Sequence, residues 1–210
     1  MNKQWRIRLA VFLIAIGIPL AFFLYWKYRL DRAPSEADQV PVLWPVPDFR
    51  IAYSESDTLS ASDLRGKVVV ADFIFTHCGS ICPQLSMTMR QIQESFRKDD
   101  RVVLISFTID PERDSFPVLR DYAMRYGALP GKWFFLRADT SVIWPLAAEG
   151  FRVPVVYTPE GGLGFEFTHT NRLVLIDAEG RIRGFYNGLE KESVDQLYND
   201  LGRLLIGMRL

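Results

Sequence analysis

The chain has only two cysteines, Cys78 and Cys82, and both lie in the stretch DFIFTHCGSICPQLSMTM. A spacing of four places two side chains on the same side of a helical turn, with Cβ atoms about 5–6 Å apart. Such a pair can chelate a soft metal, and it can form a disulfide if the helix loosens, because a disulfide needs Cβ atoms about 4 Å apart. Thiols at a helix N-terminus favour the thiolate, which is the form that binds metals and attacks disulfides.

Three interpretations of this pair follow. A purely structural bridge gains little stability, because the loop that it would close is short. The pair could instead be redox-active, or it could hold a soft metal, which is the interpretation we favour. A closed structural zinc site is disfavoured because it normally needs four protein ligands. A peroxidase is disfavoured as well, because the motif P-x3-T-x2-C would need proline and threonine where the chain has Ala71 and Phe75.

A metal site needs a further ligand, and the chain has two histidines, His77 and His169. His77 precedes Cys78 and would point away from it if the strand continues, so we interpret His77 as a partly exposed loop residue. His169 lies in GLGFEFTHTNRLVLID, just before a strand that must pair with the central sheet, so its loop can fall beside the cysteine loop. A single loop histidine is more often a surface residue than a ligand, and the spacing alone does not decide the role of His169.

The elements around these residues alternate between strand and helix. KVVVADFIF (67–75) and RVVLISFTI (101–109) are continuous apolar runs, typical of strands buried on both faces. Apolar residues at spacings of four, three and four predict a helix over about 82–97. The further elements expected are a helix between Ser115 and Gly127, a strand near 133–136, a helix near 141–149, two strands within 172–186 and a closing helix over about 194–205. This order predicts an α/β, thioredoxin-like fold, in which helices flank both faces of a central mixed sheet.

The strand over 67–75 delivers Cys78 to the loop at its carboxyl end, which is the edge where ligands gather in open α/β sheets. Asp110, Arg113 and Asp114 follow the next strand and should lie at the same edge. They could contact the site or a docking partner, and turn and capping chemistry explains them equally well.

The N-terminal part of the chain has a different composition. Positions 9–26 (LAVFLIAIGIPLAFFLYW) run for eighteen residues without a charge, about the length that a helix needs to cross a bilayer. We predict a transmembrane anchor there, preceded by a cytoplasmic N-terminus (1–8) and followed by a tether (27–45) and the folded domain (46–210). A cleaved signal peptide would have a shorter apolar core and a small-x-small cleavage site, whereas aromatic residues follow here. Basic residues flank both ends, so charge alone does not orient the anchor.

Charge argues against nucleic acid as a partner. The whole chain has 25 basic and 25 acidic residues, but the basic excess lies at the front. Without positions 1–33, the remainder carries about five more acidic than basic residues, and it contains no basic cluster.

Three segments together resemble the Sco/SenC family of copper-handling, thioredoxin-fold proteins: GKVVVADFIFTHCGSICP, FTIDPERD and FTHTNRLVLIDAEGRIRGFYNG. The resemblance runs from Pro47 to the C-terminus. It implies that Cys78, Cys82 and His169 are the ligands of a copper ion, Cu(I) or Cu(II), and that His77 is a neighbour that does not bind. Thiolates select Cu(I), and imidazole is acceptable to both oxidation states.

The function implied by the resemblance is that of a membrane-anchored metallochaperone. It would deliver copper to the CuA site of cytochrome c oxidase, or keep the cysteines of that site reduced. The expected partners are the oxidase subunit that carries CuA, a copper donor protein and a thiol reductant. The family's single N-terminal transmembrane helix would place the domain on the periplasmic side of the inner (cytoplasmic) membrane. The alternative is a thiol–disulfide oxidoreductase or redox sensor that uses the Cys78/Cys82 pair without metal.

The chain departs from the family's usual pattern beside both groups of expected ligands. Family members commonly have proline and an acidic residue after the first cysteine, where this chain has Gly79 and Ser80. Many have aspartate before the distal histidine, where this chain has Thr168. The first change removes a local charge, and the second removes a carboxylate that could orient the histidine. Both changes bear on metal affinity and on the redox balance of the pair.

Overall fold

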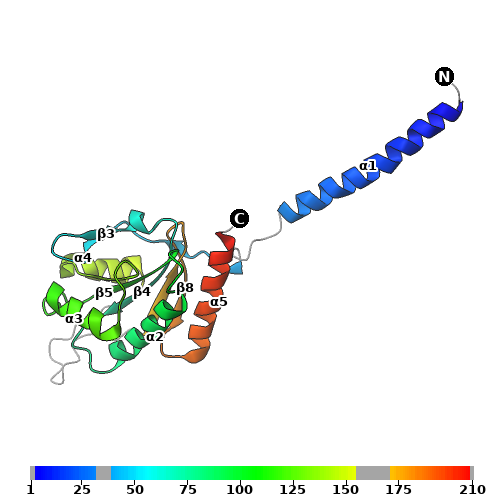
Figure 1. Cartoon of the computed structure of the whole chain (residues 1–210). Coiled ribbons are helices and arrows are strands. Elements are labelled where there is room, and N and C mark those ends of the chain that lie inside the picture. Colours follow the sequence, from blue (N-terminus) through cyan, green and yellow to red (C-terminus); the bar gives the residue numbers. More distant parts are fainter. Residues whose placement is uncertain (1–2, 32–38, 155–170, 209–210) are drawn as a thin grey trace. The chain divides into compact units, whose positions relative to one another are not determined.

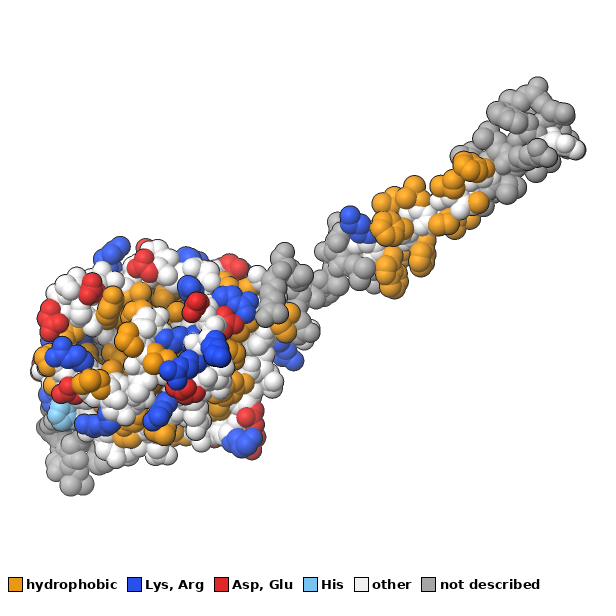
Figure 2. All heavy atoms as spheres, in the orientation of Figure 1, with side chains coloured by type: hydrophobic (Ala, Val, Ile, Leu, Met, Phe, Trp, Pro, Cys, Tyr) orange, Lys and Arg blue, Asp and Glu red, His pale blue; other side chains and the backbone are white. Residues whose placement is uncertain are grey.

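The computed structural model describes residues 3–31, 39–154 and 171–208. The chain forms two units, which divide after residue 35, and helix α1 (Lys3–Asp31) makes up the first. Large apolar side chains are exposed along the described part of α1 (Figure 2), namely Phe12, Ile16, Ile18, Leu20, Phe22, Phe23, Leu24, Tyr25, Trp26 and Tyr28. Within the described residues no helix combines the length and the apolarity needed to cross a membrane, so the anchor predicted over 9–26 is not shown by the structure.

The second unit is built on a six-stranded sheet with the order β1-β8-β7-β4-β5-β6 (Figure 1). Its strands are β1 (Trp44–Pro45), β4 (Val68–Ile74), β5 (Val102–Thr108), β6 (Trp133–Leu136), β7 (Arg172–Ile176) and β8 (Arg181–Asn187). β4, β5 and β6 run parallel, whereas β7 is antiparallel to β4 and β8 is antiparallel to β7. Every residue of β4 and β5 is buried, as expected for parallel strands that are covered on both faces. The predicted mixed sheet is confirmed.

Helices cover both faces of this sheet (Figure 1). The helices are α2 (Ile81–Ser95), α3 (Phe116–Tyr126), α4 (Thr140–Pro145) with a π-helical turn η3 (Leu146–Gly150), and α5 (Lys191–Gly207). α2 joins α3 through the Ser86 and Tyr122 hydroxyls, 2.8 Å apart, and it contacts α5 through stacked aromatic rings. On the other face, Phe151 after η3 packs edge-on against Phe73 of β4, with ring centroids 5.4 Å apart.

Most elements expected from the sequence are present close to their predicted bounds. β6 has the bounds expected, and the helix predicted over 82–97 ends at Ser95. Gly127 ends α3 in the left-handed conformation, with φ of 70°, which a residue without Cβ adopts at low cost. A small hairpin of β2 (Arg50–Ala52) and β3 (Thr58–Ser60) was not expected, because strands of three residues are too short for an alternating pattern to be recognised.

The sequence analysis ends the tether at residue 45, whereas the chain packs onto the sheet from Val40 onward. Val40 is buried, and β1 pairs with the edge strand β8. Arg183 of β8 donates hydrogen bonds to the backbone carbonyls of Val40 and Pro41. This contact joins two backbone carbonyls to an arginine that is distant in the sequence, so the composition of the tether did not predict it.

Candidate thiol and metal site

Both cysteines lie where β4 ends and α2 begins. Cys78 and Cys82 are free thiols and are 5% and 3% exposed. The backbone N–H of Cys82, in the first turn of α2, donates a hydrogen bond to Cys78 Sγ over 3.3 Å. The residue at the N-cap position, Ser80, makes no capping bond with its side chain, so the Cys78 sulfur satisfies an amide that the helix leaves open. An amide donor and the positive end of the helix both stabilise negative charge on that sulfur.

The two thiols differ in their electrostatics. The hydrogen bond with Cys78 raises the pKa of the Cys82 thiol far above its usual range, and burial raises it further. Negative charge on Cys78 and on Asp72 adds to this effect. Cys82 therefore keeps its proton in the metal-free protein, and a reaction of its sulfur has to remove that proton.

The loop before the cysteines is held by a buried carboxylate. Asp114 accepts hydrogen bonds from the backbone N–H of Thr76 (3.1 Å), from the Thr76 hydroxyl (2.5 Å) and from the Thr108 hydroxyl (2.5 Å). Burial raises the pKa of Asp114, although these donors partly offset the rise. Asp114 thereby ties the segment after β5 to the segment that delivers Cys78.

Two other charged residues of the same segment, Asp110 and Arg113, bind each other. Arg113 Nε donates to Asp110 Oδ2 over 2.5 Å, which closes the loop on itself. Arg137 holds the loop from outside through two hydrogen bonds to the Pro111 carbonyl. Of the three residues singled out at this edge, Asp114 contacts the cysteine loop, and Asp110 and Arg113 act in the turn.

Of the two histidines considered as metal ligands, the structure describes one, His77. The side chain of His77 is 57% exposed, and its Nδ1 lies 3.2 Å from the Thr76 hydroxyl and 3.9 Å from Asp114, as expected for a partly exposed loop residue. His169 lies outside the described residues. The strand that follows it, β7, pairs with β4 as expected, with Ala71 opposite Val174. Across the described residues, no group of three or more His, Cys, Asp or Glu side chains forms a metal site.

Asp72 is a buried charged residue that the sequence analysis passed over. It lies within β4, six positions before Cys78, and its side chain is fully buried. Burial raises the pKa of Asp72 to about 7, and the Ser106 hydroxyl opposite it in the β4–β5 register offsets only part of the rise. The signal was available, since this is the one charged residue in the run VVVADFIF.

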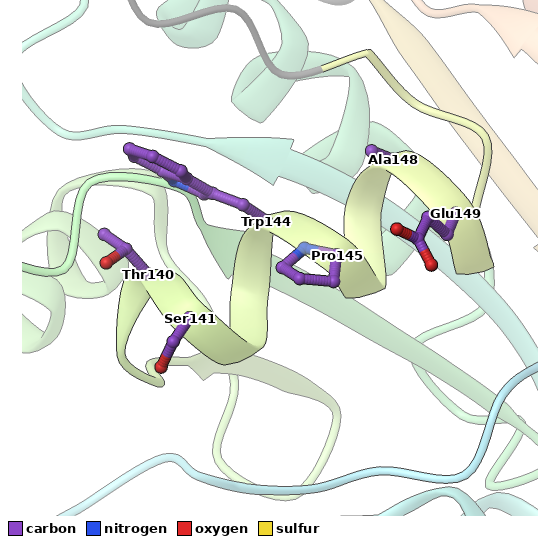
Figure 3. A pocket seen from close by; sticks show the side chains of 6 residues that line it. All are labelled: Thr140, Ser141, Trp144, Pro145, Ala148 and Glu149. Atoms are coloured by element: carbon purple, nitrogen blue, oxygen red, sulfur yellow. The ribbon is translucent and has the colours of Figure 1, made fainter.

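A surface hollow of about 480 Å³ lies along α4 and η3 (Figure 3). Its lining residues are Thr140, Ser141, Trp144, Pro145, Ala148 and Glu149. The hollow contains no cysteine or histidine, and α4 covers the face of the sheet opposite α2. The thiol pair is therefore the better candidate for the functional site.

Similarity to known proteins identifies the family of this chain. The family profile described as SCO1/SenC matches residues 45–205. The chain belongs to the SCO1/SenC family. The SCO1 protein homolog of Bacillus subtilis (strain 168) is 31% identical over 163 residues, which cover 77% of this chain and 83% of the relative.

Two further relatives of this SCO1/SenC chain bear on fold and chemistry. The solved structure of BsSco, described as a Sco protein of cytochrome c oxidase assembly with a disulfide switch, aligns with a TM-score of 0.67 at 30% identity, over 77% of this chain and 94% of BsSco. A relative from Stutzerimonas stutzeri, named as a candidate copper-binding protein, is 25% identical over 66% of this chain and 67% of its own length. The structural match agrees with the expected thioredoxin-like fold.

Proposed function

We propose that this SCO1/SenC protein binds copper through Cys78, Cys82 and His169. It delivers the copper to the CuA site of cytochrome c oxidase, or keeps the cysteines of that site reduced. The observation that carries the proposal is the pair of free thiols at the start of α2, joined by the bond from the Cys82 amide to Cys78 Sγ. Two soft sulfur donors four residues apart suit Cu(I), and they lie at the sheet edge where ligands gather in open α/β folds.

The relatives support this proposal in two respects. BsSco is described as a protein of cytochrome c oxidase assembly, and the Stutzerimonas stutzeri relative is named for copper binding. Copper is cargo in this scheme, so the protein needs a copper donor, a thiol reductant that keeps both sulfurs free, and the oxidase subunit that carries CuA. Burial of both thiols limits access, which favours transfer inside a docked complex over release into solution.

The histidines test the metal site, because the chain contains only two and only one is a proposed ligand. We expect the reduced chain to bind about one Cu(I) under anaerobic titration. His169→Ala should weaken Cu(II) binding by more than about 100-fold, since loss of a group that merely orients a ligand typically costs about 10–100-fold. His77→Ala is the matched control and should leave both affinities unchanged. No stoichiometric copper in the wild-type chain would refute the proposal.

A second candidate function is thiol–disulfide exchange by the same pair. It is favoured by the asymmetry of the thiols, in which the Cys78 sulfur accepts an amide hydrogen bond and Cys82 holds its proton, and by the disulfide switch described for BsSco. In this case His169→Ala would leave oxidase assembly intact, whereas replacement of either cysteine would abolish it. Copper trafficking requires all three residues.

We also propose that α1 anchors the protein in the inner membrane, with the folded unit on the periplasmic side. The proposal is supported by the uncharged run over 9–26 and by the exposed apolar side chains of α1. The protein should remain with membranes after alkaline carbonate extraction, and protease added to spheroplasts should digest the folded unit. A chain without residues 1–33 is the control and should be recovered in the soluble fraction. Extraction of the full chain by carbonate would contradict anchoring.

A further inference from the structure

The strand β6 lies at one end of the six-stranded sheet, and β5 is the only strand of that sheet that pairs with it. An open strand edge invites pairing with another chain, and natural proteins usually protect such an edge with charged residues or proline. The four residues of β6, Trp133–Leu136, are all apolar and include neither. The outer edge of β6 is therefore a candidate for pairing with a further strand.

The backbone groups of β6 point alternately toward β5 and toward the outer edge. The Lys132 carbonyl accepts the Leu104 N–H of β5 over 2.8 Å, so every second residue counted from Lys132 bonds to β5. Trp133 and Phe135 therefore direct their backbone groups outward. The Trp133 N–H donates to the Leu129 carbonyl over 3.1 Å, whereas the N–H and the carbonyl of Phe135 have no backbone partner among the described residues.

A short contact with the hairpin of β2 and β3 shows the direction in which this edge can pair. The Arg137 N–H, just beyond β6, donates to the Ala52 carbonyl over 2.9 Å, and the two residues form an isolated antiparallel bridge. After Ala52 the chain turns into the hairpin, where the Tyr53 N–H donates to the Asp57 carbonyl. β2 therefore stops pairing with the outer edge before it reaches Phe135.

The unpaired edge lines a groove of about 510 Å³, which we call the β6 groove. Side chains alternate along a strand, so successive residues of β6 face different walls of this groove. The Phe135 ring packs toward α3, with its centroid 6.0 Å from that of Tyr122. The Phe134 ring packs toward the hairpin, with its centroid 5.2 Å from that of Tyr53. The groove therefore has α3 on one side, the hairpin on the other and the edge of β6 between them.

This geometry favours an extended peptide as the occupant. An added strand would satisfy the backbone groups of Phe135 and would place its side chains alternately against α3 and against the hairpin. A second copy of β6 fits poorly, because that strand lies between its own two walls. The walls also differ in charge, since Arg120 on α3 is exposed and makes no ion pair with the described residues, whereas the hairpin wall carries Glu55.

We propose that the β6 groove binds an extended segment of another protein, which pairs antiparallel with β6 as an added strand. The segment's central residue exchanges two backbone hydrogen bonds with Phe135. Its side chain is apolar and points to the α3 wall, where Leu119 and Ala123 line the groove. An acidic side chain two positions away, on the same face of the segment, meets Arg120.

This docking site does not depend on the proposed copper function. No cysteine lines the groove, and β5 separates β6 from β4, the strand that leads to the thiol pair. A chain that bound no copper would still bind the segment.

The test uses the full-length chain in detergent and the fluorescein-labelled peptide TETVTVT, in which the glutamate and both valines share one face of a strand. Fluorescence anisotropy should show saturable binding, and amide hydrogen exchange within 133–136 should slow when the peptide is added. An N-methyl group on the central valine removes the donor to the Phe135 carbonyl. The methylated peptide should therefore bind at least about fivefold more weakly.

Arg120→Glu should weaken binding of TETVTVT about threefold and strengthen binding of the charge-reversed peptide TKTVTVT by a similar factor. Arg125→Glu is the matched control, because Arg125 is exposed on the same helix but does not line the groove, and it should change neither affinity. Failure of TETVTVT to bind, equal binding of the methylated peptide, or equal effects of both arginine variants would overturn the proposal. A dimer of the chain that TETVTVT dissociates would assign the groove to a second copy and would overturn it as well.

Discussion

The wild-type folded unit is expected to lose stability as the pH rises from 4 to 8, and Asp72→Asn is expected to abolish this loss. The pKa of Asp72 is about 7 in the folded protein and about 3.8 when the chain is unfolded. The folded state therefore binds the proton more tightly, unfolding releases it, and raising the pH through this interval favours unfolding. Three pKa units correspond to about 4 kcal/mol. Asparagine does not titrate in this range. The free energy of unfolding of the variant, relative to that of the wild type, should therefore rise by about this amount between pH 4 and pH 8.

Urea unfolding of residues 36–210 in reductant, at half-unit pH steps, measures this difference. The change with pH is the quantity of interest, because it does not depend on how well a buried amide fits the site. Asp72→Leu is the companion variant. It should differ from Asp72→Asn by a constant offset and show the same pH dependence. A stability difference that stays constant from pH 4 to pH 8 would mean that the folded protein does not hold this proton.

Removal of either thiol should have the largest effect on copper. Cys78→Ser or Cys82→Ser leaves one soft donor, and a hydroxyl does not replace a thiolate for Cu(I). We expect the Cu(I) affinity to fall by more than about 100-fold in each variant. Loss of a group that only orients a ligand costs up to about 100-fold, and loss of a ligand itself should cost more. Competition with a chromophoric Cu(I) chelator under anaerobic conditions gives the affinities directly.

Ser86→Ala provides the matched control for the cysteine variants. Ser86 lies one turn beyond Cys82 on α2 and is buried, and its hydroxyl contacts Tyr122. Its replacement perturbs the same helix without removing a sulfur, so the Cu(I) affinity should remain within about threefold of wild type. Similar losses in all three variants would show that the helix, and not the sulfurs, governs binding.

Local patterns were sufficient to predict most elements of the fold. The runs over 67–75 and 101–109 are apolar throughout because both faces of their strands are covered, and this information is contained in each segment separately. The end of α3 was predictable for a similar reason, since Gly127 suits the left-handed conformation that ends a helix. The hairpin of β2 and β3 was not, because short strands carry too little periodicity.

The candidate site was predictable only in part. Cys78 and Cys82 are recognised by residue type and spacing, and the strand and helix around them place the pair at the start of α2. Asp114 could be placed at the same edge, but its bonds to Thr76 join residues 38 positions apart. That contact depends on how the loops after β4 and β5 meet, and no local pattern describes such a meeting.

The amino-acid sequence alone predicts the strands, the helices and the presence of two soft donors, because each of these depends on residues that are close together in the sequence. The packing of α2 and α3 on the sheet decides which polar groups share a buried space. An aspartate in an apolar run could have faced solvent at a strand edge. Only the assembled sheet and helices bury Asp72 completely and leave both of its carboxyl oxygens without a hydrogen-bond partner among the described residues.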